Sequence, residues 1–152
     1  MADFGCGYGT FTIPAAQMIS GKVYAFDIEP EMIRAVEAKA KESNLNNIVA
    51  ILRDFISEGS GLKHLSVDFV FLFNNLRAEN PVYLLKEAYR VLTQGKKAGI
   101  IHWKYDATIL DGPSMDIRPR PEQCRGWAES ADFHFEKQLN LKPYHYGIVM
   151  KK

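Results

Sequence analysis

The chain has 152 residues, of which 47% are hydrophobic and 24% are charged, an ordinary composition for one soluble globular domain with a real core. Its 19 basic and 18 acidic residues are interspersed and leave a formal charge of +1, so no basic patch indicates binding to nucleic acid or an anionic membrane. No apolar run approaches the ~18 residues needed to cross a bilayer.

The apolar periodicity switches repeatedly between 2 and 3.6 residues, which predicts alternating strands and helices. Helical patterns, marked by proline in the first turn or glycine after the end, cover 10–20, 29–44, 81–94 and about 121–131. Short apolar strand patterns cover 22–28, 47–54, 66–73 and 98–103. Strands that alternate with helices in this way form parallel sheets covered by helices.

Two of the predicted helices have clear inward faces. In 29–44 the residues that share an apolar face are Met32, Ile33, Val36 and Ala40. In 81–94, with Asn80 as the candidate cap and Gly95 after the end, the inward residues are Val82, Leu85, Tyr89 and Leu92. The last segments, 133–141 and 144–152, alternate and are joined near Pro143, which predicts an antiparallel hairpin.

The start of the chain, MADFGCGYGTF, carries the most specific motif. A dinucleotide-binding loop, G-x-G-x-x-G, would need its third glycine where this chain has Thr10. The chain instead has Asp3 followed by Gly5, Gly7 and Gly9, which resembles the (D/E)-x-G-x-G-x-G motif of class I S-adenosylmethionine-dependent methyltransferases. The methionine tail of that cofactor has no phosphate, so the backbone must approach it closely, and side chains at the glycines would obstruct it. The Asp3 carboxylate suits the ammonium group of the tail.

Further residues match the same family in the same order. The resemblance implies that Asp27, at the end of the second strand, accepts hydrogen bonds from both ribose hydroxyls, and that Asp54, after the third strand, binds the adenine amino group. The resemblance therefore implies a cofactor site made of these residues: Asp3, Gly5, Cys6, Gly7, Gly9, Asp27, Ile28, Met32, Asp54, Phe55 and Asn74. Ile28 and Met32 would offer apolar surface to the adenine ring, and Asn74 would lie under the cofactor.

The resemblance covers essentially the whole chain and implies one class I methyltransferase domain over residues 1–152. The implied fold is α/β: a Rossmann-like, mostly parallel sheet with helices on both faces, here ending in a C-terminal antiparallel hairpin. The implied function is transfer of a methyl group from S-adenosylmethionine to an acceptor, which we expect to be a small molecule. The D/N-P-P-F/Y signature of enzymes that methylate amino groups of bases and glutamine is absent, because Phe73, Asn74, Asn75 and Leu76 stand there.

Two other functions remain open. Arg77 and Glu79 replace the histidine-rich stretch that many relatives carry after the fourth strand, so a non-catalytic domain that binds S-adenosylmethionine or a partner is one alternative. A nicotinamide-dependent oxidoreductase is the other, and Thr10 disfavours it.

The candidate catalytic residue is His102, because substrate often enters after the fifth strand in this family, although His102 could equally be a hydrogen-bonded interior histidine. Cys6 is expected to pack as a small side chain rather than to act as a nucleophile, since no basic residue is positioned to lower its pKa. Cys6 and Cys124 are too few for a disulfide framework and suit the cytoplasm.

The start of the chain also carries an expectation. In the family, several apolar residues precede the acid of the first motif, and helices precede that strand; here only Met1 and Ala2 precede Asp3. We therefore expect a truncated first strand without upstream helices, which implies lower stability and weaker cofactor binding, or a homodimer that covers the gap.

Overall fold

The computed structural model describes residues 1–77 and 79–152. The chain divides into two compact units, Met1–Leu62 (unit 1) and Lys63–Lys152 (unit 2). None of the helices within the described ranges has the length and apolar character needed to span a bilayer.

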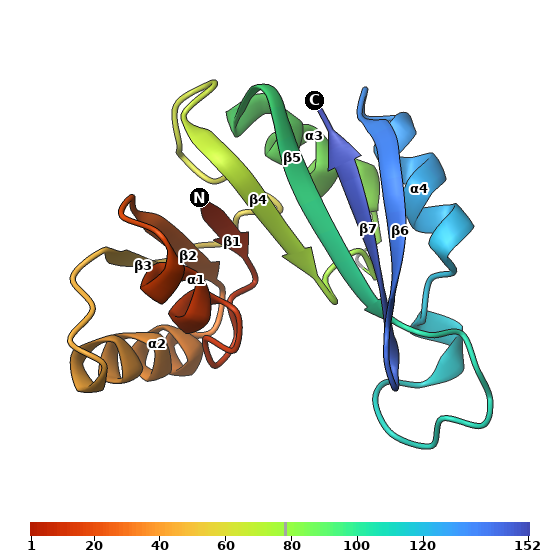
Figure 1. The fold of residues 1–152 in the computed structure, drawn as a ribbon, viewed down its shortest axis with the longest axis horizontal. Helices are drawn as coiled ribbons and strands as arrows, with labels where there is room; N and C mark the ends of the chain where they lie inside the picture. Colours follow the sequence, from red (N-terminus) through yellow and green to blue (C-terminus); the bar gives the residue numbers. More distant parts are fainter. Residues whose placement is uncertain (78) are drawn as a thin grey trace. The chain divides into compact units, whose positions relative to one another are not determined.

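Unit 1 is a parallel sheet with two helices beside its strands (Figure 1). Its elements are β1 (Ala2–Phe4), α1 (Thr12–Met18), β2 (Val23–Asp27), α2 (Pro30–Glu42) and β3 (Ile48–Leu52). The strand order is β3-β2-β1, with Phe4 opposite Phe26 and Phe26 opposite Ile51. Because the strands are parallel, the segments that follow them leave the sheet at one edge, where ligands bind in open α/β sheets.

The two faces of this sheet have different cores. On one face the fully buried Phe4 and Phe26 rings pack edge to face, with centroids 5.4 Å apart, and the Phe55 ring stacks on Phe4 at 5.3 Å. On the other face a cluster of small and branched side chains joins the glycine-rich segment, β2 and α2; its buried members are Cys6, Ala25, Ile33 and Val36. Three of the four residues predicted to face inward on α2 are buried, and the fourth, Met32, is half-buried.

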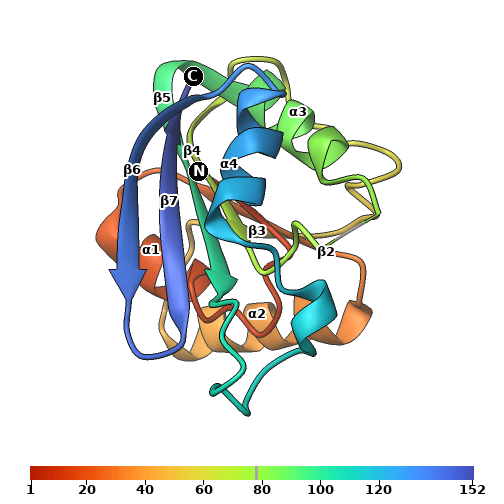
Figure 2. The ribbon, with the colours of Figure 1, turned by 90° about the vertical axis from the view of Figure 1, so that its right-hand side faces the viewer.

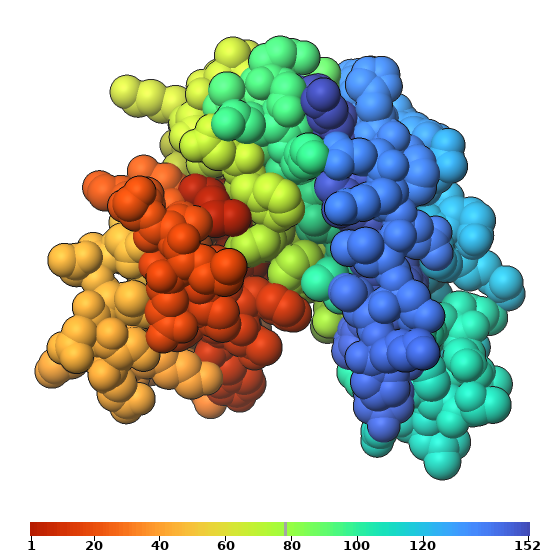
Figure 3. Space-filling view, in the orientation of Figure 1, coloured from red at the N-terminus to blue at the C-terminus, as the bar shows by residue number. Residues whose placement is uncertain are grey.

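Unit 2 is a mixed sheet with the strand order β4-β5-β7-β6. Its described elements are β4 (Val67–Phe73), α3 (Pro81–Val91), β5 (Leu92–Trp103), the 3₁₀ helix Met115–Ile117, α4 (Pro121–Glu129), β6 (His134–Leu141) and β7 (His145–Lys151). β4 and β5 are parallel, whereas β7 runs antiparallel to β5 and β6, so the predicted C-terminal hairpin is confirmed. Figure 2 shows α3 and α4 side by side, and both helices contact strands of this unit. β6 is largely exposed, and its surface is uncovered in the space-filling view (Figure 3).

The structure corrects the prediction for the segment around α3. The helix ends at Val91, not at position 94, and Leu92 already begins β5. Leu92 is fully buried, has extended backbone angles and pairs with Val67. This strand pairing ends the helix at Val91. Gly95, predicted to follow the helix, lies instead within β5 at a positive φ of 76°. Asn80 occupies the cap position without a side-chain hydrogen bond to the helix end.

The inward face of α3 is also rotated from the predicted one. Val82 and Tyr89, predicted to point inward, are only half-buried. The buried residues of the helix are Pro81, Leu84, Leu85, Ala88 and Val91. Tyr89 instead packs edge to face against Phe133, with ring centroids 5.1 Å apart.

The buried face of α3 generates a stability prediction. Leu84→Ala removes a fully buried side chain and should lower the free energy of unfolding by about 2–5 kcal/mol. Tyr83→Ala, at a neighbouring position whose side chain is 65% exposed, should change it by about 0.5 kcal/mol or less. Urea unfolding followed by circular dichroism measures both, and equal losses in the two variants would show that the assigned face is wrong.

Candidate functional site

The segment after β1 is a tight loop that only glycine can form easily. Its three glycines have positive φ angles, 77° at Gly5, 51° at Gly7 and 77° at Gly9. L-residues rarely adopt these angles, because the Cβ atom crowds the backbone. The loop is tied to β2, since the N–H groups of Gly5 and Cys6 both donate to the carbonyl oxygen of Phe26, at 2.9 and 2.8 Å.

Gly7 and Gly9 have different environments. A Cβ atom on Gly9 would lie 3.2 Å from Cγ2 of Val36 and 3.3 Å from Cγ1 of Ile13, so this glycine lets the loop pack against side chains of both helices. A Cβ atom on Gly7 would meet no atom of the described residues within 4 Å. The backbone at Gly7 is therefore open on its Cα side, as close approach by a ligand requires.

Asp27, the last residue of β2, connects this loop to the next helix. Its Oδ2 accepts a hydrogen bond from Gly7 N at 2.8 Å, and its Oδ1 accepts one from Glu29 N at 3.1 Å. The side chain is mostly buried but not sealed, with 8% of the residue exposed. A carboxylate offers about four lone-pair sites, so two remain for further donors such as a pair of hydroxyls.

Asp3 lies beneath the loop rather than on its surface. It is 2% exposed, and its Oδ2 accepts a hydrogen bond from the hydroxyl of Thr12 at 2.5 Å. Burial, with a smaller effect of the Asp27 charge, raises the pKa of Asp3 to about 6, while the Thr12 hydrogen bond opposes this rise. The contact of Thr12 with Asp3 is not predicted from the sequence. A hydroxyl residue at the first position of the helix after the loop could have indicated it.

The other predicted residues of unit 1 have mixed positions. A hydrogen bond from the Ser57 side chain is the main cause that lowers the pKa of Asp54. Hydrogen bonds that Oδ1 accepts from the backbone N–H groups two and three residues later, at 3.2 and 3.1 Å, lower this pKa further. Ile28 is 56% exposed and Met32 is half-buried, so both have apolar surface available. Phe55 is buried against Phe4, so its ring belongs to the core. The contacts of these residues with a cofactor stay predictions.

Cys6 packs as a small apolar residue, as expected. It is 7% exposed and lies in a cluster with Ala25 and Val36. Burial, together with the charges of Asp3 and Asp27, raises the pKa of its thiol to about 12. The thiol therefore stays protonated at neutral pH and does not serve as a nucleophile.

In unit 2, Asn74 directly follows β4 and is held in an unusual conformation. Its φ is 58°, and its backbone N–H donates to the carbonyl oxygen of Ile101 at 2.8 Å. The side-chain Oδ1 is buried and accepts no hydrogen bond from any described residue. Leaving a buried acceptor without a donor costs about 1–3 kcal/mol of folding free energy. The Asn74 Oδ1 can therefore accept a hydrogen bond from an N–H or O–H group of a ligand.

His102 has the features of an interior histidine. It is 3% exposed, and its Nε2 accepts a hydrogen bond from Leu76 N at 3.2 Å. Burial lowers the pKa of His102 to about 4, with smaller effects from Arg77 and His145. The ring is therefore neutral at neutral pH, and the nitrogen that would accept a proton is already occupied. A catalytic role for His102 stays a prediction, and the geometry favours the alternative.

Asn74 and His102 line one cavity of about 190 Å³, which we call the β4–β5 cavity. The other lining residues are Arg77, Trp103, Pro113, Ile117 and Arg118. Arg118 was not identified from the sequence, because an arginine in a loop rich in proline and glycine carries no signal of burial. Only its 5% exposure in the folded chain reveals it.

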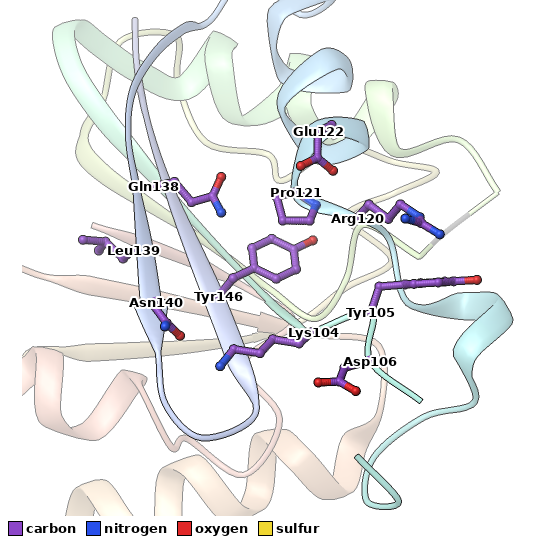
Figure 4. A pocket seen from close by; sticks show the side chains of 10 residues that line it. All are labelled: Lys104, Tyr105, Asp106, Arg120, Pro121, Glu122, Gln138, Leu139, Asn140 and Tyr146. Carbon is purple, nitrogen blue, oxygen red and sulfur yellow. The ribbon is translucent and has the colours of Figure 1, made fainter. Parts of the chain in front are cut away.

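A second cavity, of about 460 Å³, lies around Tyr146 (Figure 4). Its charged lining residues balance, with Lys104 and Arg120 against Asp106 and Glu122. The Tyr146 hydroxyl donates to the carbonyl oxygen of Pro119 at 2.7 Å, and burial raises its pKa. This cavity therefore offers polar surface without an excess of one charge among its described lining residues.

Comparison with known proteins identifies the family. A model of the methyltransferase domain matches residues 1–95, more than half of the chain. The chain belongs to the methyltransferase domain family. S-adenosylmethionine is the cofactor that this membership assigns, so the family and the cofactor predicted from the glycine loop are both confirmed.

Two curated proteins are similar to this chain. It is 32% identical over 155 residues to the ribosomal protein L11 methyltransferase of Limosilactobacillus fermentum, covering 100% of this chain and 42% of the relative. It is 31% identical over 88 residues to the tRNA (guanine(37)-N(1))-methyltransferase of Dictyostelium discoideum, covering 55% of this chain and 18% of the relative. The chain thus spans less than half the length of either relative.

The solved structures confirm the predicted fold class. A SAM-dependent methyltransferase from Aquifex aeolicus superposes with a TM-score of 0.90 at 24% identity, over 99% of this chain and 80% of that one. The α/β, Rossmann-like methyltransferase fold with antiparallel C-terminal strands is therefore established for this chain.

The different environments of two glycines generate a prediction. Gly7→Ala should cost about 1–2 kcal/mol of folding free energy, the strain of a left-handed L-residue. Gly9→Ala should cost about 2–5 kcal/mol, because crowding against Val36 and Ile13 adds to the same strain. Urea unfolding of the two variants side by side tests this order, and a Gly7 variant that is the less stable of the two would overturn it.

The raised pKa of Asp3 generates a second prediction. Between about pH 4 and pH 6 the folded protein holds the Asp3 proton that the unfolded chain has released, so this residue lowers stability as the pH rises. Asp3→Asn keeps an acceptor for Thr12 and removes the charge. The difference in unfolding free energy between variant and parent should grow by about 2–3 kcal/mol across this range. His102 also titrates in this range, but it does so equally in parent and variant, so its contribution cancels in the difference. A difference that does not change with pH would contradict the assignment.

Proposed function

We propose that this chain transfers a methyl group from S-adenosylmethionine to a small-molecule acceptor. The observation that carries the proposal is the open backbone at Gly7 beside the Asp27 carboxylate, which retains acceptor capacity for two hydroxyl groups. This pairing suits a ligand with a ribose and a tail that runs against bare backbone.

The residues of unit 1 fit the cofactor as follows. Asp27 would accept the ribose hydroxyls, and Gly7 would lie against the methionine tail. Asp54, whose carboxylate also accepts hydrogen bonds from the backbone and side chain of Ser57, would accept the adenine amino group. Asp3 would act from below the loop, because a nearby ammonium group favours the ionised carboxylate that burial disfavours.

When bound, S-adenosylmethionine supplies a methyl group that is already electrophilic. The protein's own task is to orient the accepting atom, exclude water and remove a proton where the acceptor carries one. We propose that the β4–β5 cavity holds the acceptor. Its buried Asn74 Oδ1 would receive an N–H or O–H group of that molecule and orient it. The main requirement is to align the accepting atom with the methyl group. This requirement explains why no strong catalytic motif is visible in the sequence.

A small-molecule acceptor is a proposal beyond the family assignment, because the curated relatives are named for a ribosomal protein and a tRNA. The small size of the β4–β5 cavity and the balanced charge of the chain support it. A cytoplasmic location, supported by the two buried free cysteines, and a single domain over 1–152 belong to the same proposal. Self-association into a homodimer also stays a proposal.

A non-catalytic domain that binds S-adenosylmethionine is the second candidate. It is favoured by His102, whose Nε2 is engaged by Leu76 N, which leaves the β4–β5 cavity without an obvious base among its described lining residues. Turnover of S-adenosylmethionine with a panel of small nucleophiles separates the two functions. Binding of the cofactor without turnover of any acceptor would favour the second.

The cofactor assignment generates a binding prediction. Asp27→Ala should weaken binding of S-adenosylhomocysteine by about 1.5–3 kcal/mol, because a charged acceptor is lost. Gly7→Val should abolish binding, because it places a side chain in the open space beside the loop. Glu37→Ala, on the exposed surface of α2, serves as the matched control and should bind normally.

Isothermal titration calorimetry on variants shown to be folded makes this measurement, with oxidised nicotinamide adenine dinucleotide as the competing ligand. Unchanged affinity in a folded Asp27→Ala variant would rule out the ribose assignment. Tight binding of the dinucleotide would instead support an oxidoreductase.

A further inference from the structure

We propose that the acceptor carries an anionic group, a carboxylate or a phosphate, and that the β4–β5 cavity binds this group through the charges of Arg77 and Arg118. The inference rests on the proposed function only in calling the bound molecule the acceptor. The described residues of the anion site all belong to unit 2.

Arg118 carries a buried positive charge. Its guanidinium nitrogens donate to carbonyl oxygens of the preceding loop, at 2.7 Å from Pro113 and 2.6 Å from Asp111, with longer contacts of 3.4–3.5 Å to Lys104, Asp106 and Ile109. The group also lies 5.6 Å from the ring centre of Trp103. These contacts satisfy its N–H donors but supply no negative charge.

No ion pair within the described part of the chain involves Arg118. The charge of Arg118 lowers the pKa of Asp106, but this effect is minor beside the hydrogen bonds of Asp106 to Thr108. Asp106 is exposed and does not line the β4–β5 cavity. Buried charges in proteins are generally paired, because an unpaired charge away from water is costly. The Arg118 charge therefore has no ion-pair partner among the described residues, and an anion in the cavity would supply one.

Arg77 supplies a second charge whose hydrogen-bond donors are available. Its side chain is exposed, and neither a hydrogen bond nor an ion pair joins it to any described residue. It lines the same cavity as Arg118, and its charge contributes to the lowered pKa of His102. An arginine with uncommitted donors can hold a carboxylate or phosphate through two parallel hydrogen bonds.

The rest of the cavity lining suits an anionic ligand that also carries a hydrogen-bond donor. The described lining includes two arginines and no aspartate or glutamate. Asn74 presents a buried amide oxygen that has no donor among the described residues, and Trp103 gives a flat apolar wall. A volume of about 190 Å³ admits a small polar group or a compact molecule, not a long chain. A hydroxy acid, an amino acid or a small phosphate ester meets these requirements.

The test uses the full chain with Trp127→Phe, which leaves Trp103 as the reporter because the sequence has two tryptophans. Trp103 fluorescence is titrated with inorganic phosphate, with acetate and with acetamide as the neutral match for acetate, all in constant sodium chloride. We expect saturable changes with phosphate or acetate and none with acetamide. The tighter of the two anions identifies the preferred source. No saturable change with either anion, or an equal response to acetamide, would overturn the proposal.

Arg77 is the residue to vary, because replacing Arg118 would also release the loop carbonyls that it holds. Arg77→Gln should weaken anion binding at least tenfold, and Arg77→Lys should weaken it less. Arg125→Gln, on α4 outside this cavity, is the matched control and should leave the affinity unchanged. A loss of less than twofold in Arg77→Gln, or an equal loss in Arg125→Gln, would overturn the proposal.

Calorimetry with S-adenosylhomocysteine on the same variants separates this inference from the proposed function. Cofactor binding without anion binding would overturn this inference alone. Anion binding without cofactor binding would overturn the proposed function and leave the anion site in place.

Discussion

The two hydrogen bonds accepted by Asp27 are the interaction on which the loop of unit 1 depends. One carboxylate oxygen holds Gly7 N of the glycine loop, and the other holds Glu29 N at the start of α2. Since Asp27 ends β2, this side chain joins the loop after β1, the end of the neighbouring strand and the next helix. The conformation of the loop follows, because only glycine takes positive φ at three alternate positions without strain.

Neighbouring residues of the glycine loop serve different purposes, since some allow close packing and others leave room for a ligand. Gly9 allows close packing of the loop against Val36 and Ile13, whereas Gly7 leaves space for a ligand. Asp3 is hydrogen-bonded to Thr12, and its burial disfavours the ionised carboxylate. A cation bound nearby would reduce the free-energy cost of ionising Asp3. Perturbed carboxylates of this kind are frequent at binding sites, and here the perturbation has an identified cause in burial.

Most of the fold could be predicted from the sequence because its elements have strong local signals. Pro30 at the first turn and the apolar spacing of α2 define that helix, and the hairpin of β6 and β7 follows from alternation around a turn. The end of α3 could not be predicted, since Leu92 suits a helix locally and becomes a strand residue only by pairing with Val67. Tertiary pairing overrides local preference at such boundaries.

The candidate site divides in the same way. Glycines and acids at strand ends are visible because their spacing is short and regular, and the family match confirms the family and the cofactor that they indicate. The β4–β5 cavity was visible only in part. Asn74 and His102 follow strands, but the burial of Arg118 depends on carbonyl groups up to 14 residues away. The polar segment 106–120 is organised around this one buried arginine, whose guanidinium donates to carbonyl oxygens of Pro113 and Asp111.

The most direct measurement is a crystal structure of the chain grown with S-adenosylhomocysteine. The assignment predicts ribose hydroxyl oxygens within about 2.5–3.0 Å of the Asp27 carboxylate, with the amino acid tail against the backbone of Gly7. A ligand bound elsewhere, or a ribose without contact to Asp27, would contradict it.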